Sequence, residues 1–337
     1  MTGRRPLARV LAAGCAARLG YAALTRAQPG GEQTWTRTNH RGEPVTLLQG
    51  PAVTAGAVAA ALAVPGLDAR LRLALGLAGA GAGAVGGYDD LAASGDRRGF
   101  RGHLGALAKG EVTTGAIKIA GIGAAGLAAA LLLDCRGNGR SAVTGPVPSA
   151  PRRIADVGVN AALVAASANL INLFDLRPGR AIKVGALASL ALALAGPQAR
   201  AAAAAPAGAA AALLPEDVGE RSMLGDGGAN ALGAMLGVAA AASLPRPARI
   251  TALGVVAGLT AASEKVSFTK VIARTPPLNW LDMLGRRPPP APESARAAGP
   301  APDSASAADA AVRRQGGTAV ADGTAQSSAA TGTPRPR

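Results

Sequence analysis

The chain has 337 residues, a formal net charge of +15, 49% hydrophobic residues and only 2% aromatic residues. A soluble domain of this length would carry more charge than the 16% found here, and several uncharged stretches approach the roughly 20 apolar residues that cross a bilayer. The composition excludes an ordinary soluble enzyme and predicts an integral membrane protein. Two cysteines without a CxxC pair argue against a zinc site or a disulfide scaffold. Few aromatics and no clustered basic helix argue against nucleic acid as a partner.

Apolar stretches bounded by charges, proline and glycine predict about nine membrane-spanning helices. In chain order they cover residues 7–24, 51–67, 71–88, 112–133, 154–174, 181–196, 200–214, 229–244 and 250–263. Arg9 and Arg18 interrupt the first, and we expect their stems to snorkel to the nearer interface. Its basic start lacks a convincing cleavage site, so we interpret it as an anchor and not as a signal peptide. The glycines of 76–87 predict a close approach of helix backbones.

The C-terminal part differs from the rest of the chain. Residues 264–282 are too charged to cross a membrane, and we expect an interfacial segment with Trp280 at head-group level. From residue 287 onward, proline, alanine and serine dominate and cannot bury enough apolar area to fold. The predicted fold is an all-α, polytopic membrane bundle of about nine to ten transmembrane helices over residues 1–286, with a disordered tail over 287–337.

Acidic residues at the ends of predicted spans are the most informative feature, because a carboxylate at the membrane edge needs a partner or a metal. Asp89 and Asp90 end the third span, Asp175 ends the fifth, and Asp226 precedes the eighth. Two predicted spans lie between each motif and the next, so the chain returns to the same side of the membrane each time. This alternation places all four carboxylates on one side of the membrane.

Each motif also has a simpler explanation. The Asp89-Asp90 pair could be a solvated helix end, and Asp226 could cap the helix that follows it. Asn169 and Asn172 share one helix face with the Asp175 motif through their three-residue spacing, which could be a hydrogen-bond seam between helices. Three acidic motifs on one side of a membrane are harder to explain as helix caps.

Carboxylates gathered in this way suit Mg²⁺, which takes one or two carboxylates and completes its shell with water and substrate phosphate. Lys109 and Arg177 lie in the same loops, with further arginines and lysines, and could orient phosphates. The alternative for most of these cations is an ordinary solvated cytoplasmic face. Metal, phosphate and a lipid interface together predict phosphoryl transfer.

Four motifs, taken in order, resemble those of the polyprenyl-phosphate N-acetylhexosamine-1-phosphate transferases, the family that includes phospho-N-acetylmuramoyl-pentapeptide translocase. The resemblance runs from about Asn39 to Asp282. The motifs are Gly87 to Asp90, Lys109-Gly110 with Thr113 to Lys118, Asn169 to Asp175, and Leu224 to Gly228.

The resemblance implies a multi-pass plasma-membrane enzyme with its active site and C-terminal tail on the cytoplasmic side. It would use Mg²⁺ to transfer a sugar 1-phosphate from a UDP-sugar donor to a polyprenyl phosphate acceptor within the lipid bilayer, releasing UMP. The family pattern gives catalytic roles to Asp89, Asp90, Asp175 and Asp226, metal binding to Asp226 and Asp175, and substrate binding to Lys109, Lys118, Asn169, Asn172 and Arg177. The sequence leaves open whether the protein is a homodimer.

The chain departs from the family in three respects. Relatives commonly carry a second acidic residue shortly after the fifth-span aspartate, in an Asp-Gly-x-Asp-Gly pattern, whereas residues 176–180 of this chain contain no acid. The segment Thr275 to Trp280 lacks the histidine cluster of many members, and about nine spans replace the usual ten. These departures indicate a divergent branch. Two alternatives remain open. The first is a transporter, which would place its carboxylates nearer the bilayer midplane. The second is a non-catalytic protein that binds polyprenyl phosphate or acts as a scaffold.

Overall fold

The computed structural model describes residues 4–92, 114–134 and 149–288 of the chain. Twelve helices account for 81% of these residues, and the remaining regular structure is one two-stranded antiparallel hairpin. The predicted helical class is therefore correct, and the hairpin is an element that the prediction missed. The chain divides into two units, Met1–Arg287 and Pro288–Arg337, and the predicted tail from residue 289 lies outside the described residues.

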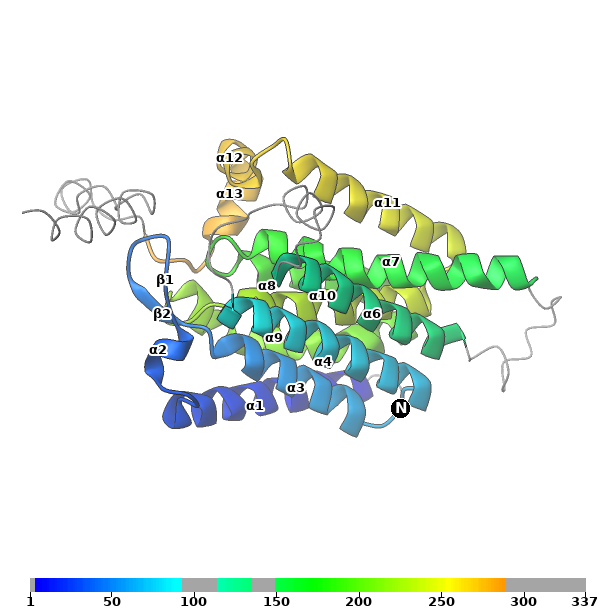
Figure 1. Cartoon of the computed structure of the whole chain (residues 1–337), viewed down its shortest axis with the longest axis horizontal. Coiled ribbons are helices and arrows are strands. Elements are labelled where there is room, and N and C mark those ends of the chain that lie inside the picture. The colour runs from blue at the N-terminus through cyan, green and yellow to red at the C-terminus, as the bar shows by residue number, and fades with distance from the viewer. Residues whose placement is uncertain (1–3, 93–113, 135–148, 289–337) are drawn as a thin grey trace, which may run out of the picture. The chain divides into compact units, whose positions relative to one another are not determined.

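Each of the nine predicted spans coincides with a helix (Figure 1). These helices are α1 (Arg4–Ala27), α3 (Gln49–Ala63), α4 (Ala69–Ala92), α6 (Thr114–Asp134), α7 (Ala150–Phe174), α8 (Arg180–Ala195), α9 (Pro197–Val218), α10 (Gly225–Ser243) and α11 (Arg246–Ser263). The other elements are α2 (Glu32–Trp35), the hairpin strands β1 (Thr36–Thr38) and β2 (Pro44–Thr46), and two short helices, α12 (Phe268–Arg274) and α13 (Pro276–Met283).

Three of these helices are long and apolar enough to cross a membrane. They are α1, α6 and α7, and α3 is apolar but shorter. The remaining five fall short in length or in hydropathy. In α4 and α10 the reason is composition, since glycine and alanine contribute little apolar area compared with leucine or isoleucine.

Helix α10 is the central element, in contact with α3, α4, α7, α8 and α9. All but three of its 19 residues are buried. Glycines bring its backbone against its neighbours: a Cβ added to Gly233 would lie 2.3 Å from the Ser167 carbonyl oxygen, and one added to Gly86 would lie 2.3 Å from that of Asp226. The close approach predicted for residues 76–87 is therefore present at Gly86, where α4 meets the start of α10.

The predicted snorkelling of Arg9 is wrong. Its side chain is fully buried and donates hydrogen bonds to the carbonyl oxygens of Val64, at 3.3 Å, and Pro65, at 2.8 Å. These carbonyls follow the last turn of α3 and have no partner within that helix. Arg18, in contrast, forms a 2.7 Å ion pair with Glu216.

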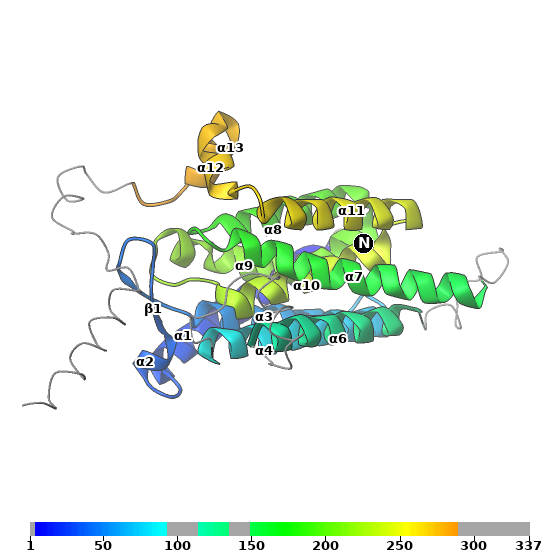
Figure 2. The ribbon, with the colours of Figure 1, turned by 45° about the horizontal axis from the view of Figure 1, so that its top comes forward.

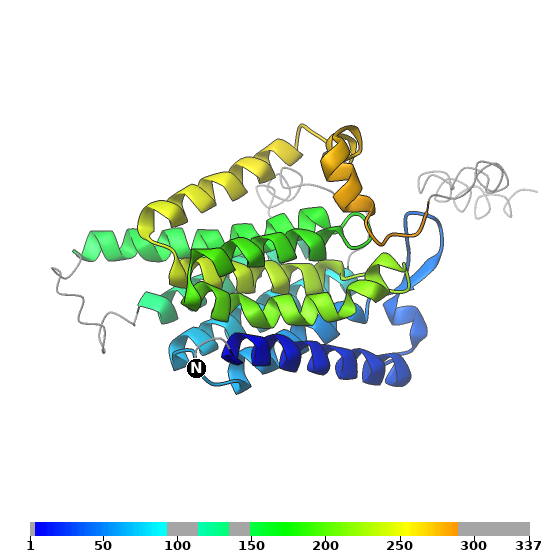
Figure 3. The same cartoon turned by 180° about the vertical axis from the view of Figure 1, so that it is seen from behind.

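The segment after α11 is helical. Helix α11 packs along α7 and has no buried residue, and α12 and α13 follow as a contacting pair at the end of the bundle that carries the hairpin (Figures 2 and 3). Trp280 on α13 is 66% exposed. Its position at head-group level stays a prediction.

Candidate functional site

The four predicted aspartates come from three helix ends that meet at one end of the bundle. Asp89 and Asp90 lie in the last turn of α4, Asp175 directly follows α7, and Asp226 lies in the first turn of α10. We call these four residues the aspartate cluster. The alternating direction of successive helices predicts this common location. The packing of α4 and α7 against α10 brings the three helix ends together.

Asp90 binds the backbone at the start of α10. Its Oδ1 accepts a hydrogen bond from the Asp226 amide at 3.0 Å, and its Oδ2 accepts one from the Gly227 amide at 2.9 Å. The first amides of a helix have no partner within the helix. Asp90 therefore caps α10 from a neighbouring helix, and it is not a solvated helix end.

Gly225 completes this junction. It has a left-handed backbone (φ 64°), and an added Cβ would lie 2.9 Å from Asp90 Oδ2, so only glycine fits here. Burial raises the pKa of the Asp175 carboxyl well above its ordinary value, and the carboxyls of Asp217 and Asp226 raise this pKa further. Asp90 thus holds the backbone on which Asp226 is mounted.

The Asp226 carboxylate does not cap its own helix. It contacts the Lys118 ammonium, which reaches it from α6, and it adjoins the carboxyl of Asp89. Lys118 Nζ also lies 3.3 Å from Asp89 Oδ2. One ammonium group is therefore shared by two carboxylates, all three side chains being only partly exposed.

The remaining predicted residues are less closely engaged. Asn172 is half-buried in the last turn of α7, where its carbonyl oxygen accepts from the Asp175 amide at 3.0 Å. Asn169 is exposed one turn earlier. Arg177 lies in the connection to α8 and lines a pocket beside the aspartate cluster. Lys109 lies outside the described residues.

Among the described residues, no group of three or more His, Cys, Asp and Glu side chains is arranged to hold a metal ion. The closest approach is the pair of Asp89 and Asp226, which already binds a cation, the Lys118 ammonium. Paired carboxylate oxygens are the donors that Mg²⁺ prefers. The donor chemistry therefore fits this ion at the pair of Asp89 and Asp226, whereas no ion pair joins Lys118 to Asp175, the predicted partner of Asp226, in the described part of the chain.

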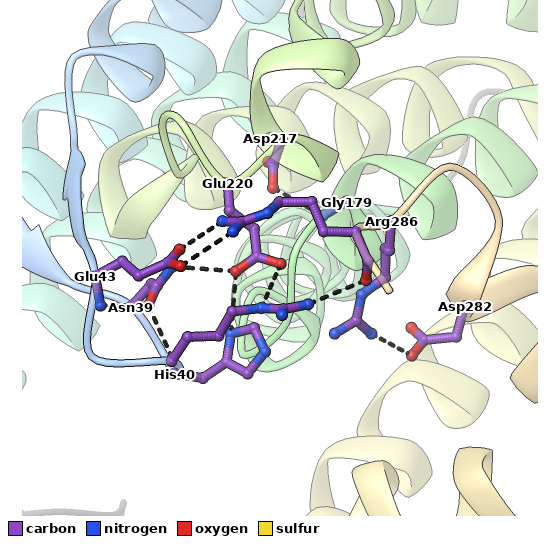
Figure 4. Close-up of polar contacts among 10 residues, drawn as sticks. Asn39, His40, Glu43, Gly179, Asp217, Glu220, Asp282 and Arg286 are labelled. Atoms are coloured by element: carbon purple, nitrogen blue, oxygen red, sulfur yellow. Dashed lines mark hydrogen bonds and ion pairs between the residues drawn. The ribbon is translucent and has the colours of Figure 1, made fainter. Parts of the chain in front are cut away.

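A pocket of about 220 Å³ adjoins the cluster and contains residues that the sequence reasoning missed. Asp175 and Arg177 line it together with His40, Asp217 and Glu220. Asp217 is buried and accepts from the Gly179 amide at 2.7 Å, so it fixes the connection between α7 and α8 (Figure 4). One signal was available: Asp217 lies in the last turn of α9 and Glu220 follows it, and this helix corresponds to the seventh predicted span, which ends on the same side as the other odd-numbered spans.

Glu220 fixes the hairpin beside this pocket. It has a left-handed backbone (φ 57°), and its buried carboxylate accepts from Arg41 Nε at 2.9 Å and from Asn39 Nδ2 at 3.1 Å (Figure 4). Both donors lie in the turn between β1 and β2. A residue just beyond α9 thus determines where a loop near the N-terminus lies, which no local sequence pattern indicates.

Helices α12 and α13 are held against α8 by a buried ion pair. Arg180 donates from Nε and Nη2 to the two oxygens of Asp282, at 2.7 and 3.0 Å. Lys183 Nζ adds a hydrogen bond of 2.6 Å to the Asp282 carbonyl oxygen, and Phe174 stacks on Phe268 with ring centroids 5.1 Å apart. We call this set of contacts the C-terminal clamp. It brings α13 to the end of the bundle that carries the aspartate cluster.

No protein-family model matches the chain, and a search of curated proteins finds no relative.

Proposed function

We propose that the chain is a multi-pass membrane transferase that moves a sugar 1-phosphate, that of an N-acetylhexosamine, from a UDP-sugar to polyprenyl phosphate and releases UMP. The observation that carries the proposal is the sharing of one ammonium group by Asp89 and Asp226 at the junction of α4, α6 and α10. Phosphoryl transfer requires positioning and neutralisation of phosphate charge more than covalent chemistry by the protein. Carboxylates that bind a cation beside a lysine meet that requirement.

Within this proposal the four aspartates have two different tasks. Asp226 and Asp89 expose oxygens toward the shared cation and would hold Mg²⁺, which when bound neutralises the phosphates of the substrates. Asp90 has both oxygens committed to backbone amides. It is a positioning residue that fixes the backbone under Asp226, and Asp175 is a buried carboxyl beside the cluster. This division differs from the family pattern, which gives all four aspartates catalytic roles.

Lys118 contacts the carboxylates of both Asp89 and Asp226 and would pair with a substrate phosphate. The pocket lined by His40, Arg177 and Asp217 lies next to the cluster, where polar groups of the donor could bind. The acceptor would reach the cluster from the bilayer, with all nine helices from α1 to α11 spanning the plasma membrane and the cluster on the cytoplasmic side. These helices alternate in direction, so the acids share one side.

The test is UMP release by the purified full chain from a panel of UDP-sugars, with undecaprenyl or decaprenyl phosphate and with or without Mg²⁺. We expect release that needs one donor, the lipid and the metal. Asp226→Asn and Asp89→Asn should each lower turnover by at least about a hundredfold, since each removes a charge aimed at the reacting phosphates.

Asp134→Asn is the matched control, because Asp134 ends α6 at the opposite end of the bundle from Lys118. It should keep turnover near that of the unmodified chain. If the folded chain releases no UMP with any donor in the panel, or if the Asp226 and Asp89 variants keep full turnover, the proposed function is wrong.

A further inference from the structure

Arg9 in α1 is a fully buried charge without an acidic partner among the described residues. Its hydrogen bonds go to backbone carbonyls, those of Val64 and Pro65 and, at 3.4 Å, that of Ala201. Its Nε is buried and has no partner. Burial of an ionised group that lacks a counter-charge is costly. The structure thus offsets this cost with carbonyl dipoles alone, and the Nε–H group remains unpaired.

A cavity of about 450 Å³ lies directly beside Arg9, where the start of α1, the α3–α4 connection and the start of α9 meet. Arg5, Gly66, Asp68 and Pro197 line it together with Arg9. We call this cavity the arginine pocket. Figures 1 and 3 show the start of α1 at the end of the bundle remote from the hairpin. The 24 residues of α4 separate the two ends by about 36 Å, close to the thickness of a bilayer.

Gly66 brings two guanidinium groups together in this pocket. It has a left-handed backbone (φ 108°), and an added Cβ would lie 3.3 Å from Arg5 Nη1 and 3.4 Å from Arg9 Nη2. Both guanidinium groups are positively charged, so they repel each other unless an anion lies between them. A guanidinium pair of this kind matches the oxygens of a phosphate group.

The surrounding charges strengthen this preference. Arg72 is one of the charges nearest to Arg9, and its Nε is also buried without a partner. The one acid that lines the pocket among the described residues is Asp68, whose Oδ1 accepts from the Arg70 amide at 3.0 Å at the start of α4. The pocket therefore keeps a positive excess, and its remaining walls include apolar side chains such as Leu71.

We propose that the arginine pocket binds a phosphate group, most favourably that of an anionic lipid head group at the membrane face opposite the aspartate cluster. Apolar walls beside a guanidinium pair suit an amphiphile whose phosphate enters the pocket while its chains stay in the bilayer. The site shares no residue with the aspartate cluster. Its test is a binding measurement, so its outcome does not depend on the proposed transferase activity.

The experiment is native mass spectrometry of the full chain, purified in a neutral detergent and titrated with phosphatidylglycerol or with phosphatidylcholine. We expect the first phosphatidylglycerol to bind at least about tenfold more tightly, because phosphatidylcholine carries a choline cation beside the same phosphate and the positive pocket repels that cation. Arg5→Gln should remove this preference, since Arg5 is exposed and its replacement leaves no buried group without a partner. Arg26→Gln is the matched control, because Arg26 is an exposed arginine in the last turn of the same helix.

Arg9→Gln is the second variant, and circular dichroism would first establish that it folds. Competition with inorganic phosphate distinguishes the source of the group: displacement of the lipid indicates a site for phosphate itself, and lack of displacement indicates a site for the whole head group. Either result supports the proposal. Equal affinity of the two lipids for the unmodified chain, or an undiminished preference in Arg5→Gln, would overturn it and leave Arg9 as a backbone cap of α3.

Discussion

Replacing Gly86 with alanine should separate α4 from α10 at the aspartate cluster. The added Cβ would lie 2.3 Å from the Asp226 carbonyl oxygen and 2.8 Å from Asn230 Nδ2. The first contact is with backbone, which no side-chain rotation can relieve. The two helices must therefore move apart by about 1 Å to restore an ordinary contact, and overpacking of this kind costs about 1–3 kcal/mol.

Gly87→Ala is the matched control. Gly87 is the next residue of the same helix, and an added Cβ there has no atom within 4 Å. Both variants gain about 1 kcal/mol of helix propensity, so the difference between them isolates the overpacking. At about 2–4 °C per kcal/mol, Gly86→Ala should melt at least about 2 °C below Gly87→Ala when helix content is followed by circular dichroism in detergent.

The same displacement should reduce activity. It pulls the Asp226 and Gly227 amides away from Asp90, which they meet at 3.0 and 2.9 Å, and a shift of about 1 Å at a reacting group can cost a hundredfold in rate. Gly87→Ala should keep the turnover of the unmodified chain. Equal melting temperatures and equal turnover for the two variants would refute the close contact of α4 with α10 at this position.

Three further predictions concern the cluster and the C-terminal clamp. Asp90→Asn should lower the free energy of unfolding by about 1–3 kcal/mol and abolish UMP release, because one backbone amide at the start of α10 loses its acceptor. An unchanged melting temperature would contradict this prediction. Asp282→Asn should cost about 3–5 kcal/mol of local stability, since Arg180 is 4% exposed and would be left without its counter-charge. A protease should then cut the connection between α11 and α12 faster than in the unmodified chain. Arg287→Gln, which breaks an exposed pair, should leave the cutting rate almost unchanged. Burial opposes ionisation of Asp282, but the hydrogen bonds and charge of Arg180 outweigh it and hold the pKa of Asp282 below its ordinary value. The clamp therefore contributes its stability above pH about 4 and loses it as the pH falls further. Fluorescence of Trp280, in a chain whose other tryptophan is replaced by phenylalanine, should stay constant from neutral pH down to that range, and a transition near neutral pH would refute the assignment.

The positions of the helices were accessible from sequence because they depend on local composition. Each of the nine apolar stretches is a helix, and most boundaries agree within a few residues. The larger differences have a physical cause. The third predicted span stops at the first charges, whereas α4 runs from Ala69 to Ala92, since arginine and aspartate at a helix end are solvated or paired and do not break the helix. Because successive helices alternate in direction, the sequence also predicted that the four aspartates lie at one end of the bundle.

The tertiary structure alone decided what each of these groups contacts. Asp89 and Asp90 are the same residue type at adjacent positions, but neighbours on a helix point about 100° apart. One therefore faces Lys118 and the other faces the amides of α10. The burial of Arg9 depends on carbonyls more than fifty residues away along the chain. Contacts of this kind follow from the packing of whole helices, and so a local pattern of residue types does not contain them.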